Sequence, residues 1–132
     1  MNNKDHKILA LKYRPKNFSE LIGQDIMVQT ITNSIKLDRL PNAYLLTGIR
    51  GVGKTTTARL IAKAINCKKN FVADSKNNPD EHCDCSHCKE IDEGKHLDVL
   101  EMDAASRTGI DDVRELIESS KYNPTSAKYK IF

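Results

Sequence analysis

Residues 48–55 of this chain read Gly48-Ile49-Arg50-Gly51-Val52-Gly53-Lys54-Thr55. They match the phosphate-loop pattern G-x-x-x-x-G-K-[S/T] at every specified position. The short apolar run 43–47, which lies between a proline and Gly48, predicts a buried strand before the loop. The apolar residues between Leu60 and Ile65 follow one helix face and predict a helix that ends near Asn66. Strand, glycine loop and helix in this order are the context in which the pattern binds phosphate.

The residue types in the loop suit a polyphosphate. Glycine permits a backbone of positive φ, so successive N–H groups can turn toward phosphate oxygens at a helix N-terminus. Lys54 is expected to reach the β- and γ-phosphates of ATP, Thr55 to ligate Mg²⁺ and Thr56 to donate to phosphate. Arg50 fits either phosphate contact or solvent. The predicted nucleotide-binding residues of the loop are Gly48, Arg50, Gly51, Val52, Gly53, Lys54, Thr55 and Thr56.

Length and charge agree with a protein that handles polyanions. The 132 residues are sufficient for one domain, no apolar run is long enough for a membrane span, and the first residues lack a secretory signal, so a cytoplasmic location is expected. Residues 1–70 hold 13 basic and 4 acidic residues, a net charge of +9, whereas residues 71–132 hold 8 and 14, a net charge of −6. The basic half suits nucleotides or nucleic acid, although solvated surface lysines produce the same excess.

The remaining periodicity completes an α/β fold, a parallel sheet flanked by helices. Residues 1–24 are expected to be irregular. Helices are predicted from Ile26 to about Leu37 and from Asp111 to Lys121, and strands over 97–102 and 128–132. The polar stretch 67–88 interrupts this alternation and is predicted to be a small insertion.

Four cysteines lie in or beside this insertion, at Cys67, Cys83, Cys85 and Cys88. Such clustering in a chain without an export signal indicates a metal site rather than a disulfide framework. Four thiolates would close a tetrahedral zinc site and leave no position for water, so the expected role of the zinc is structural. Unmetallated thiols are the alternative.

Three segments together resemble a known family. They are the N-terminal box Tyr13 to Gln24, the strand and loop Ala43 to Arg59, and the motif Asp103-Ala104-Ala105-Ser106-Arg107. From about Leu11 to Phe132 the chain is similar to the N-terminal part of the gamma/tau subunit family of bacterial DNA polymerase III, the AAA+ ATPases of clamp loaders. The resemblance implies a P-loop NTPase (AAA+) fold for residues 1–132, truncated within the domain, with the zinc insertion at 67–88.

The family also implies partners and further site residues. Its N-terminal box lines the adenine and ribose, which places Tyr13, Arg14 and Pro15 beside the base, while Phe18 is more simply a core residue. Its members use ATP to load a sliding clamp on primed DNA, in a ring of gamma/tau copies, delta and delta prime. Its insertion carries C-x2-C-x2-C, but here His82 occupies the first of these positions, so His82 is an alternative to Cys83 as zinc ligand, with His87 a third candidate.

Catalytic residues are not expected within this chain. The strand 97–102 ends in Asp103 as a Walker B strand would, but in the family the Walker B acids follow the strand that begins at Lys128. Those acids, the sensors and the arginine finger are absent, so ATP hydrolysis by these residues alone is not expected, although the family belongs to the DNA polymerase III holoenzyme. His6 and His96 are expected at the surface.

Two other functions remain open at this point. A different P-loop enzyme, such as a small nucleoside kinase, would use the same loop for phosphoryl transfer to a small acceptor. A zinc-dependent nucleic-acid-binding module would bind DNA in a salt-sensitive manner even without the loop. Neither accounts for the loop, the N-terminal box and the cysteines together.

Overall fold

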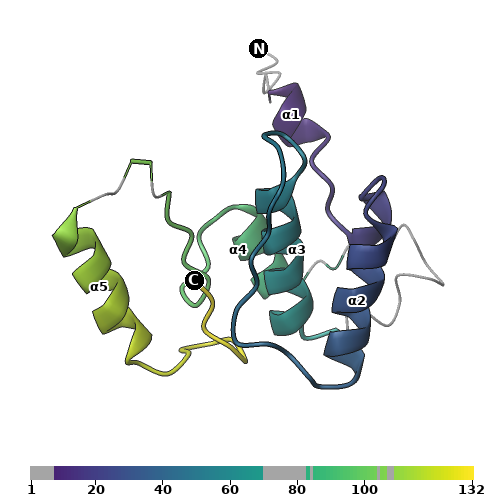
Figure 1. The fold of residues 1–132 in the computed structure, drawn as a ribbon. Coiled ribbons are helices and arrows are strands. Elements are labelled where there is room, and N and C mark those ends of the chain that lie inside the picture. The colour runs from purple at the N-terminus through teal and green to yellow at the C-terminus, as the bar shows by residue number, and fades with distance from the viewer. Residues whose placement is uncertain (1–7, 70–82, 84, 104, 107–108) are drawn as a thin grey trace, which may run out of the picture.

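A computed structural model describes residues 8–69, 83, 85–103, 105–106 and 109–132. Figure 1 shows helices joined by loops and turns. The helical elements are α1 (Leu9–Lys12), the 3₁₀ turn η1 (Phe18–Glu20), α2 (Asp25–Lys36), α3 (Lys54–Asn66), α4 (Ser86–Asp92) and α5 (Ile110–Ser120). The predicted helices at 26–37 and 111–121 are confirmed to within about one residue as α2 and α5, and α3 ends at Asn66 as predicted. Helix α4 crosses the predicted end of the insertion at residue 88. The expectation that residues 1–24 are irregular is wrong at α1 and η1.

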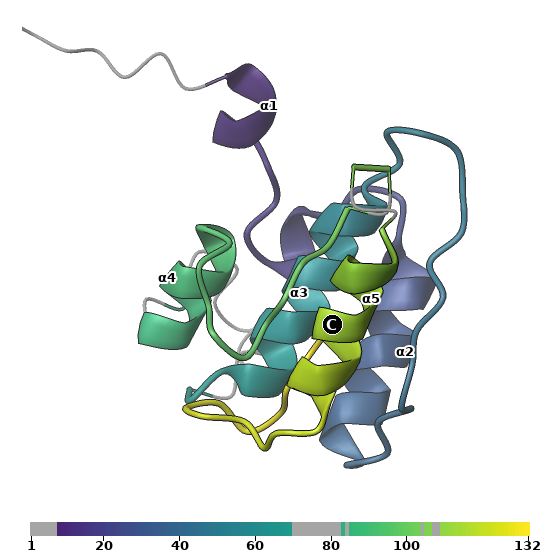
Figure 2. The ribbon, with the colours of Figure 1, turned by 90° about the vertical axis from the view of Figure 1, so that its left-hand side faces the viewer.

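The core lies between η1, α2 and α3. Its buried side chains are Phe18, Ile31, Leu60, Ile61 and Ala64, so the expectation that Phe18 is a core residue is confirmed. Figures 1 and 2 both place α3 next to α2, and α4 packs against α3 as well. The helix that follows the glycine loop is therefore the central element of the fold.

The predicted parallel sheet is wrong. Within the described residues the structure contains no strand, only one isolated parallel bridge between Val99 and Ile131. Residues 43–47 form no element, and the Leu45 side chain, expected in the core, is 89% exposed. A strand is stable only beside a neighbour that pairs its backbone groups. The apolar composition of 43–47 indicates that the segment favours burial, but it does not indicate whether a neighbouring strand is present to pair its backbone.

The side chain of Asn66 explains why the single bridge does not extend toward Tyr129. Leu100 N–H donates to Ile131 O at 2.9 Å, and Ile131 N–H to Asp98 O at 2.8 Å. A next rung would use the N–H and C=O of Tyr129, since alternate residues face the same neighbour. Both groups are instead bonded to the Asn66 amide, at 2.9 Å each. A side chain at the end of α3 thus takes the place of a strand.

Asp98 holds residues 125–127, which precede Ile131 of the bridge. Its carboxylate accepts the backbone N–H groups of Thr125, Ser126 and Ala127 at 2.7, 2.8 and 2.9 Å, and the Ser126 hydroxyl at 3.2 Å. The side chain is 1% exposed. Burial alone would raise its pKa, but these hydrogen bonds outweigh burial and hold the pKa well below the usual 3.8.

Replacing Asp98 by asparagine is expected to lower the free energy of unfolding by about 2–4 kcal/mol at pH 7, because hydrogen bonds to a charged acceptor are each worth about 1.5–3 kcal/mol. The pH dependence also changes. Because its pKa is lower in the folded state, the carboxylate stabilises the fold above about pH 4 and loses this effect as the pH falls further. Urea unfolding at pH 3, 4, 5 and 7 should therefore show that the free energy of unfolding falls less with decreasing pH in Asp98→Asn than in the parent chain. Equal acid losses in both chains would contradict this role.

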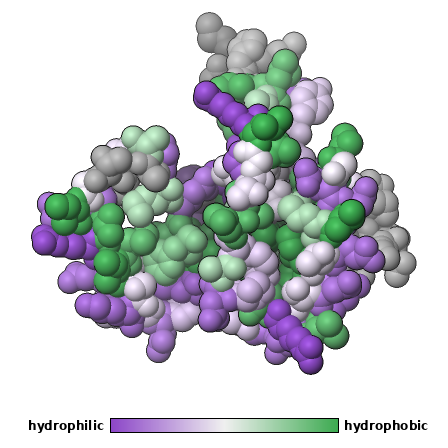
Figure 3. Space-filling model, in the orientation of Figure 1, coloured by the Kyte–Doolittle hydropathy of each residue, from purple (hydrophilic) through white to green (hydrophobic). Residues whose placement is uncertain are grey.

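Helix α5 stands apart from α2, α3 and α4 in Figure 1. None of its residues is buried, and its apolar side chains Ile110, Val113 and Ile117 are exposed. Figure 3 shows hydrophobic atoms at the surface in the area of this helix. No helix among the described residues is both long and apolar enough to cross a membrane.

Candidate functional site

The glycine loop has the backbone that its sequence predicts. Gly48, Gly51 and Gly53 have φ values of 146°, 86° and 94°, and Gly53 is the left-handed residue that precedes the first turn of α3. At positive φ a side chain strains the backbone. At Gly48 a Cβ atom would also lie 3.1 Å from Val52 Cγ1. Glycines are thus required for this path of the chain into the helix.

The Lys54 side chain folds back over the loop. Its Nζ donates to Gly48 O at 2.8 Å and to Ile49 O at 2.7 Å. The ammonium group has three N–H bonds, so one remains after these two contacts. The loop backbone thereby holds a positive charge beside the N-terminus of α3.

The loop and the first turn of α3 also offer backbone donors. The first backbone bond into α3 runs from Thr57 N–H to Gly53 O at 2.9 Å. Among the described residues, no hydrogen bond uses the backbone N–H groups of 51–56. The first N–H groups of a helix have no partner within it, and its dipole is positive at this end. The arrangement can bind an anion such as a phosphate.

The other predicted nucleotide residues are exposed or partly buried. Tyr13 is 73% exposed, and the Lys12 ammonium lies 5.5 Å from the centroid of its ring. Arg14 and Pro15 are partly buried. Arg50 and Thr55 are exposed and Thr56 is partly buried. Among the described residues, no hydrogen bond or ion pair joins 13–15 to 48–56, so the role of the box stays a prediction.

A pocket of about 590 Å³ lies elsewhere, between residues 38–46, α3 and the last four residues. Its lining includes Tyr44, Ile61, Ile65, Ile131 and Phe132, but none of residues 48–56. This mainly apolar space is therefore separate from the glycine loop.

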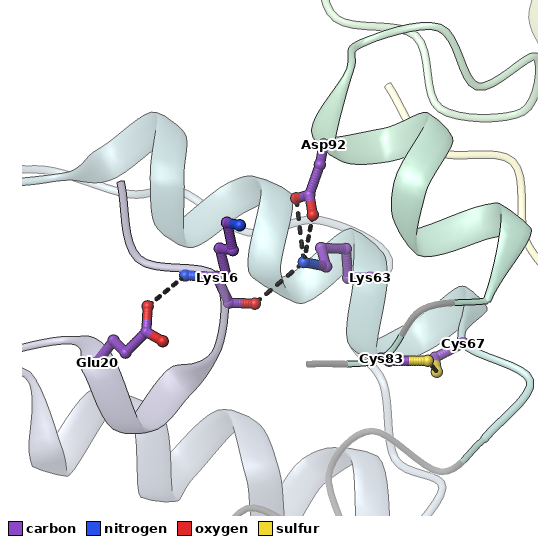
Figure 4. Close-up of polar contacts among 6 residues, drawn as sticks. All are labelled: Lys16, Glu20, Lys63, Cys67, Cys83 and Asp92. Atoms are coloured by element: carbon purple, nitrogen blue, oxygen red, sulfur yellow. Dashed lines mark hydrogen bonds and ion pairs between the residues drawn. The ribbon is translucent and has the colours of Figure 1, made fainter. Parts of the chain in front are cut away.

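Lys63 joins α3 to α4 and to the N-terminal box. This lysine is 2% exposed and extends from α3. Figure 4 shows its ammonium group between α4 and the N-terminal box, where it donates to both carboxylate oxygens of Asp92 at 3.0 and 2.9 Å and to Lys16 O at 3.0 Å. A buried charge is tolerated only when it is paired in this way. The helix of the glycine loop and the helix of the cysteines are thus joined by an ion pair.

The four predicted zinc ligands come together in the structure. The sulfurs of Cys67, Cys83, Cys85 and Cys88 all lie within 4.8 Å of one another. The Sγ atoms of Cys67 and Cys83 are 3.1 Å apart, and their close approach is visible in Figure 4. Both residues pack against the core cluster, and Cys88 is fully buried. His82 lies outside the described residues.

The donor set suits a metal ion. Zinc bonded tetrahedrally to four thiolates at about 2.3 Å would set the sulfurs about 3.8 Å apart, which is within the span that they already occupy. Four soft thiolates favour zinc over hard cations such as magnesium or calcium. The cysteines therefore form a cluster that can hold a metal ion.

The thiols differ in acidity without a metal. Burial raises the pKa of Cys85, but hydrogen bonds, first those from the backbone of Cys88 and Lys68, outweigh burial and lower the pKa to about 7. Burial and then the hydrogen bond with Cys67 raise the pKa of Cys83 to about 11. Burial also raises the pKa of Cys88. Of these three thiols, Cys85 is the most readily ionised near neutral pH.

Comparison with known proteins now places the chain. Residues 23–132 match the protein family described as DNA polymerase III, delta subunit. The chain belongs to this family. The match includes the glycine loop and all four cysteines, whereas Tyr13 to Pro15 precede it.

Curated DNA polymerase III subunits are similar over almost the whole chain. A gamma subunit of Buchnera aphidicola (subspecies Baizongia pistaciae) is 42% identical over 128 residues, which are 97% of this chain and 33% of that protein. A tau subunit of Escherichia coli is 39% identical over 96% of this chain. A gamma/tau subunit of Mycoplasma pneumoniae is 44% identical over 96% of this chain. The resemblance to gamma/tau subunits is confirmed, and the chain spans one fifth to one third of the length of these relatives.

Several residues of this DNA polymerase III family member were not predicted to matter. His96, expected at the surface, is 3% exposed, and its Nε2 lies 2.7 Å from Nδ1 of His87. Burial, then the charges of Lys68 and His96, lower the pKa of His87. Lys63 and Asp98 are also buried. Each stands among apolar residues in the sequence, a pattern that is typical of a polar side chain facing solvent. Their bonding partners are distant in the sequence, so the pattern could not reveal them. His6 lies outside the described residues.

Proposed function

We propose that this chain is the ATP-binding part of a DNA polymerase III gamma/tau clamp-loader subunit. The observation that carries the proposal is the loop, in which positive-φ glycines lead into α3 while Lys54 Nζ lies over Gly48 O and Ile49 O. The unbonded N–H groups of 51–56 would receive phosphate oxygens. Lys54 would neutralise phosphate charge, Thr55 would ligate Mg²⁺, and Thr56 and Arg50 would add donors.

The proposed setting is the one that the resemblance to clamp-loader subunits implies, and relatives named as gamma, tau and gamma/tau subunits of DNA polymerase III support it. In it the subunit assembles with gamma/tau copies, delta and delta prime in the cytoplasm, and ATP drives loading of the sliding clamp on primed DNA. Tyr13, Arg14 and Pro15 would border the base, and no residue of this chain is proposed to hydrolyse ATP. Residues 67–88 would be a structural insertion that holds zinc through Cys67, Cys83, Cys85 and Cys88.

Binding of a fluorescent ATP analogue in the presence of Mg²⁺ tests this proposal. Saturable binding is expected, displaced by ATP and ADP but not by adenosine, because the loop contributes its affinity through phosphate. Adenosine serves as the matched competitor, since it has the base and ribose but no phosphate. Binding that adenosine displaces as well as ATP does, or no binding, would contradict the proposal.

A further inference from the structure

The structure contains a buried polar chain that begins at the cysteines. His87 and His96 are 4% and 3% exposed, with ring centroids 5.0 Å apart and His87 Nδ1 2.7 Å from His96 Nε2. The other ring nitrogen of His96, Nδ1, accepts the backbone N–H of Asp98 at 3.0 Å. Because Nδ1 accepts, Nε2 of a neutral His96 bears the proton and donates to His87. The hydrogen bonds therefore run in one direction: Asp98 N–H donates to His96, and His96 donates to His87 in α4.

One end of this polar chain, His87, lies in α4 beside the cysteines. His87 lies between Cys85, which precedes α4, and Cys88 in its first turn. A metal bonded to both thiolates would fix this turn, because each ligand must keep its bond length and angle. The position of the His87 ring would then be fixed with it.

The other end is Asp98, which organises the last residues of the chain. Its carboxylate accepts the N–H groups of Thr125, Ser126 and Ala127, and its backbone carbonyl accepts Ile131 N–H. Any shift of residue 98 therefore changes several hydrogen bonds of 125–131 at once. Residues 125 and 126 are exposed, so they have little burial to keep them in place.

We infer that metal binding at the four cysteines is coupled, through His87, His96 and Asp98, to the order of residues 125–131. The inference rests on the proposed metal site but not on nucleotide binding. His96 acts as a positioning residue: it links α4 to residue 98 and is not one of the four clustered residues that could bind the metal. Two sites coupled in this way affect each other reciprocally. If metal binding favours the ordered state of residues 125–131 by a given factor, the ordered state should increase the affinity for the metal by the same factor.

Amide hydrogen exchange tests the coupling. Zinc is expected to slow exchange at Thr125, Ser126 and Ala127 by about tenfold relative to the α2 amides, which lies within the usual range for coupled sites. In His96→Ala the effect should fall below about twofold. Lys95→Ala, at the position before His96, is the matched control and should retain the full effect. Among the described residues, the exposed Lys95 side chain bonds only the exposed side chain of Glu93.

Zinc content, measured by elemental analysis on the same samples, separates the coupling from the site. Bound zinc with unchanged exchange at 125–127 in the parent chain would overturn the coupling, and equal slowing in His96→Ala would overturn its route. A chain that binds no zinc would overturn the metal site and the coupling together. If His96→Ala is unfolded by circular dichroism, chelator competition on Asp98→Asn decides: zinc bound about tenfold more weakly supports the coupling, and unchanged affinity refutes it.

Discussion

Replacing Lys54 with alanine is expected to weaken ATP binding by at least about 100-fold. The proposed lysine–phosphate contact is charge-assisted, and each hydrogen bond of this kind is worth about 1.5–3 kcal/mol. The side chain already lies over the loop, held by Gly48 O and Ile49 O. Binding therefore requires the ammonium only to exchange carbonyl oxygens for phosphate oxygens, without ordering a flexible side chain.

Two further variants define what Lys54 contributes. Lys36→Ala removes the same charge from an exposed position in the last turn of α2 and should bind ATP like the parent chain. Lys54→Arg keeps the charge but not the compact ammonium group, and we expect intermediate affinity. Fluorescence titration gives the affinities, and circular dichroism shows whether each variant is folded. Equal affinity of Lys54→Ala and the parent would remove the loop from the binding site.

The helices could be predicted because their signals are local. The glycines at 48, 51 and 53 and the apolar spacing from Leu60 to Ile65 sufficed to place the loop and α3, and the cysteine spacing to predict a metal cluster. Most of these patterns involve residues close together in the sequence, and the structure confirms the positive-φ glycines, α3 and the cluster of cysteines.

The sheet and the buried polar residues depend on distant partners. Asn66 pairs with Tyr129, 63 residues later in the sequence, where a strand was expected. Lys63 finds its carboxylate 29 residues away, at Asp92. Hydrophobicity alone shows neither contact, because the composition of a segment does not indicate which backbone or charge it meets. The burial of Asp98 could be predicted only if it were known that the backbone N–H groups of 125–127 meet its carboxylate.

These distant contacts make α3 the element through which the two candidate sites meet. Its N-terminus carries the glycine loop, Lys63 in its last turns holds α4, and Asn66 at its end holds Tyr129. Lengthening or breaking this helix would displace both sites. A helix that begins at one candidate site and ends at the other explains how the part of the chain that the structure describes can position both without a sheet.

Cys85→Ser is expected to reduce bound zinc from about one per chain to a small fraction. Loss of a residue that only supports a metal ligand already costs about 10–100-fold in affinity, and loss of a ligand should cost more. Serine keeps the size of the side chain, but its hydroxyl is a far weaker zinc donor than a thiolate. Ser86→Ala, at the exposed next position, is the matched control and should retain zinc. Elemental analysis after dialysis measures both.

The same measurement decides between Cys83 and His82. The sulfur of Cys83 lies within 4.8 Å of the other three, so we expect Cys83→Ser to release zinc and His82→Ala to retain it. Zinc retained in Cys83→Ser and lost in His82→Ala would assign a site of three thiolates and one imidazole. Because a bound metal would fix the first turn of α4, zinc loss should also lower the free energy of unfolding. A folded, equally stable chain without zinc would refute a structural role.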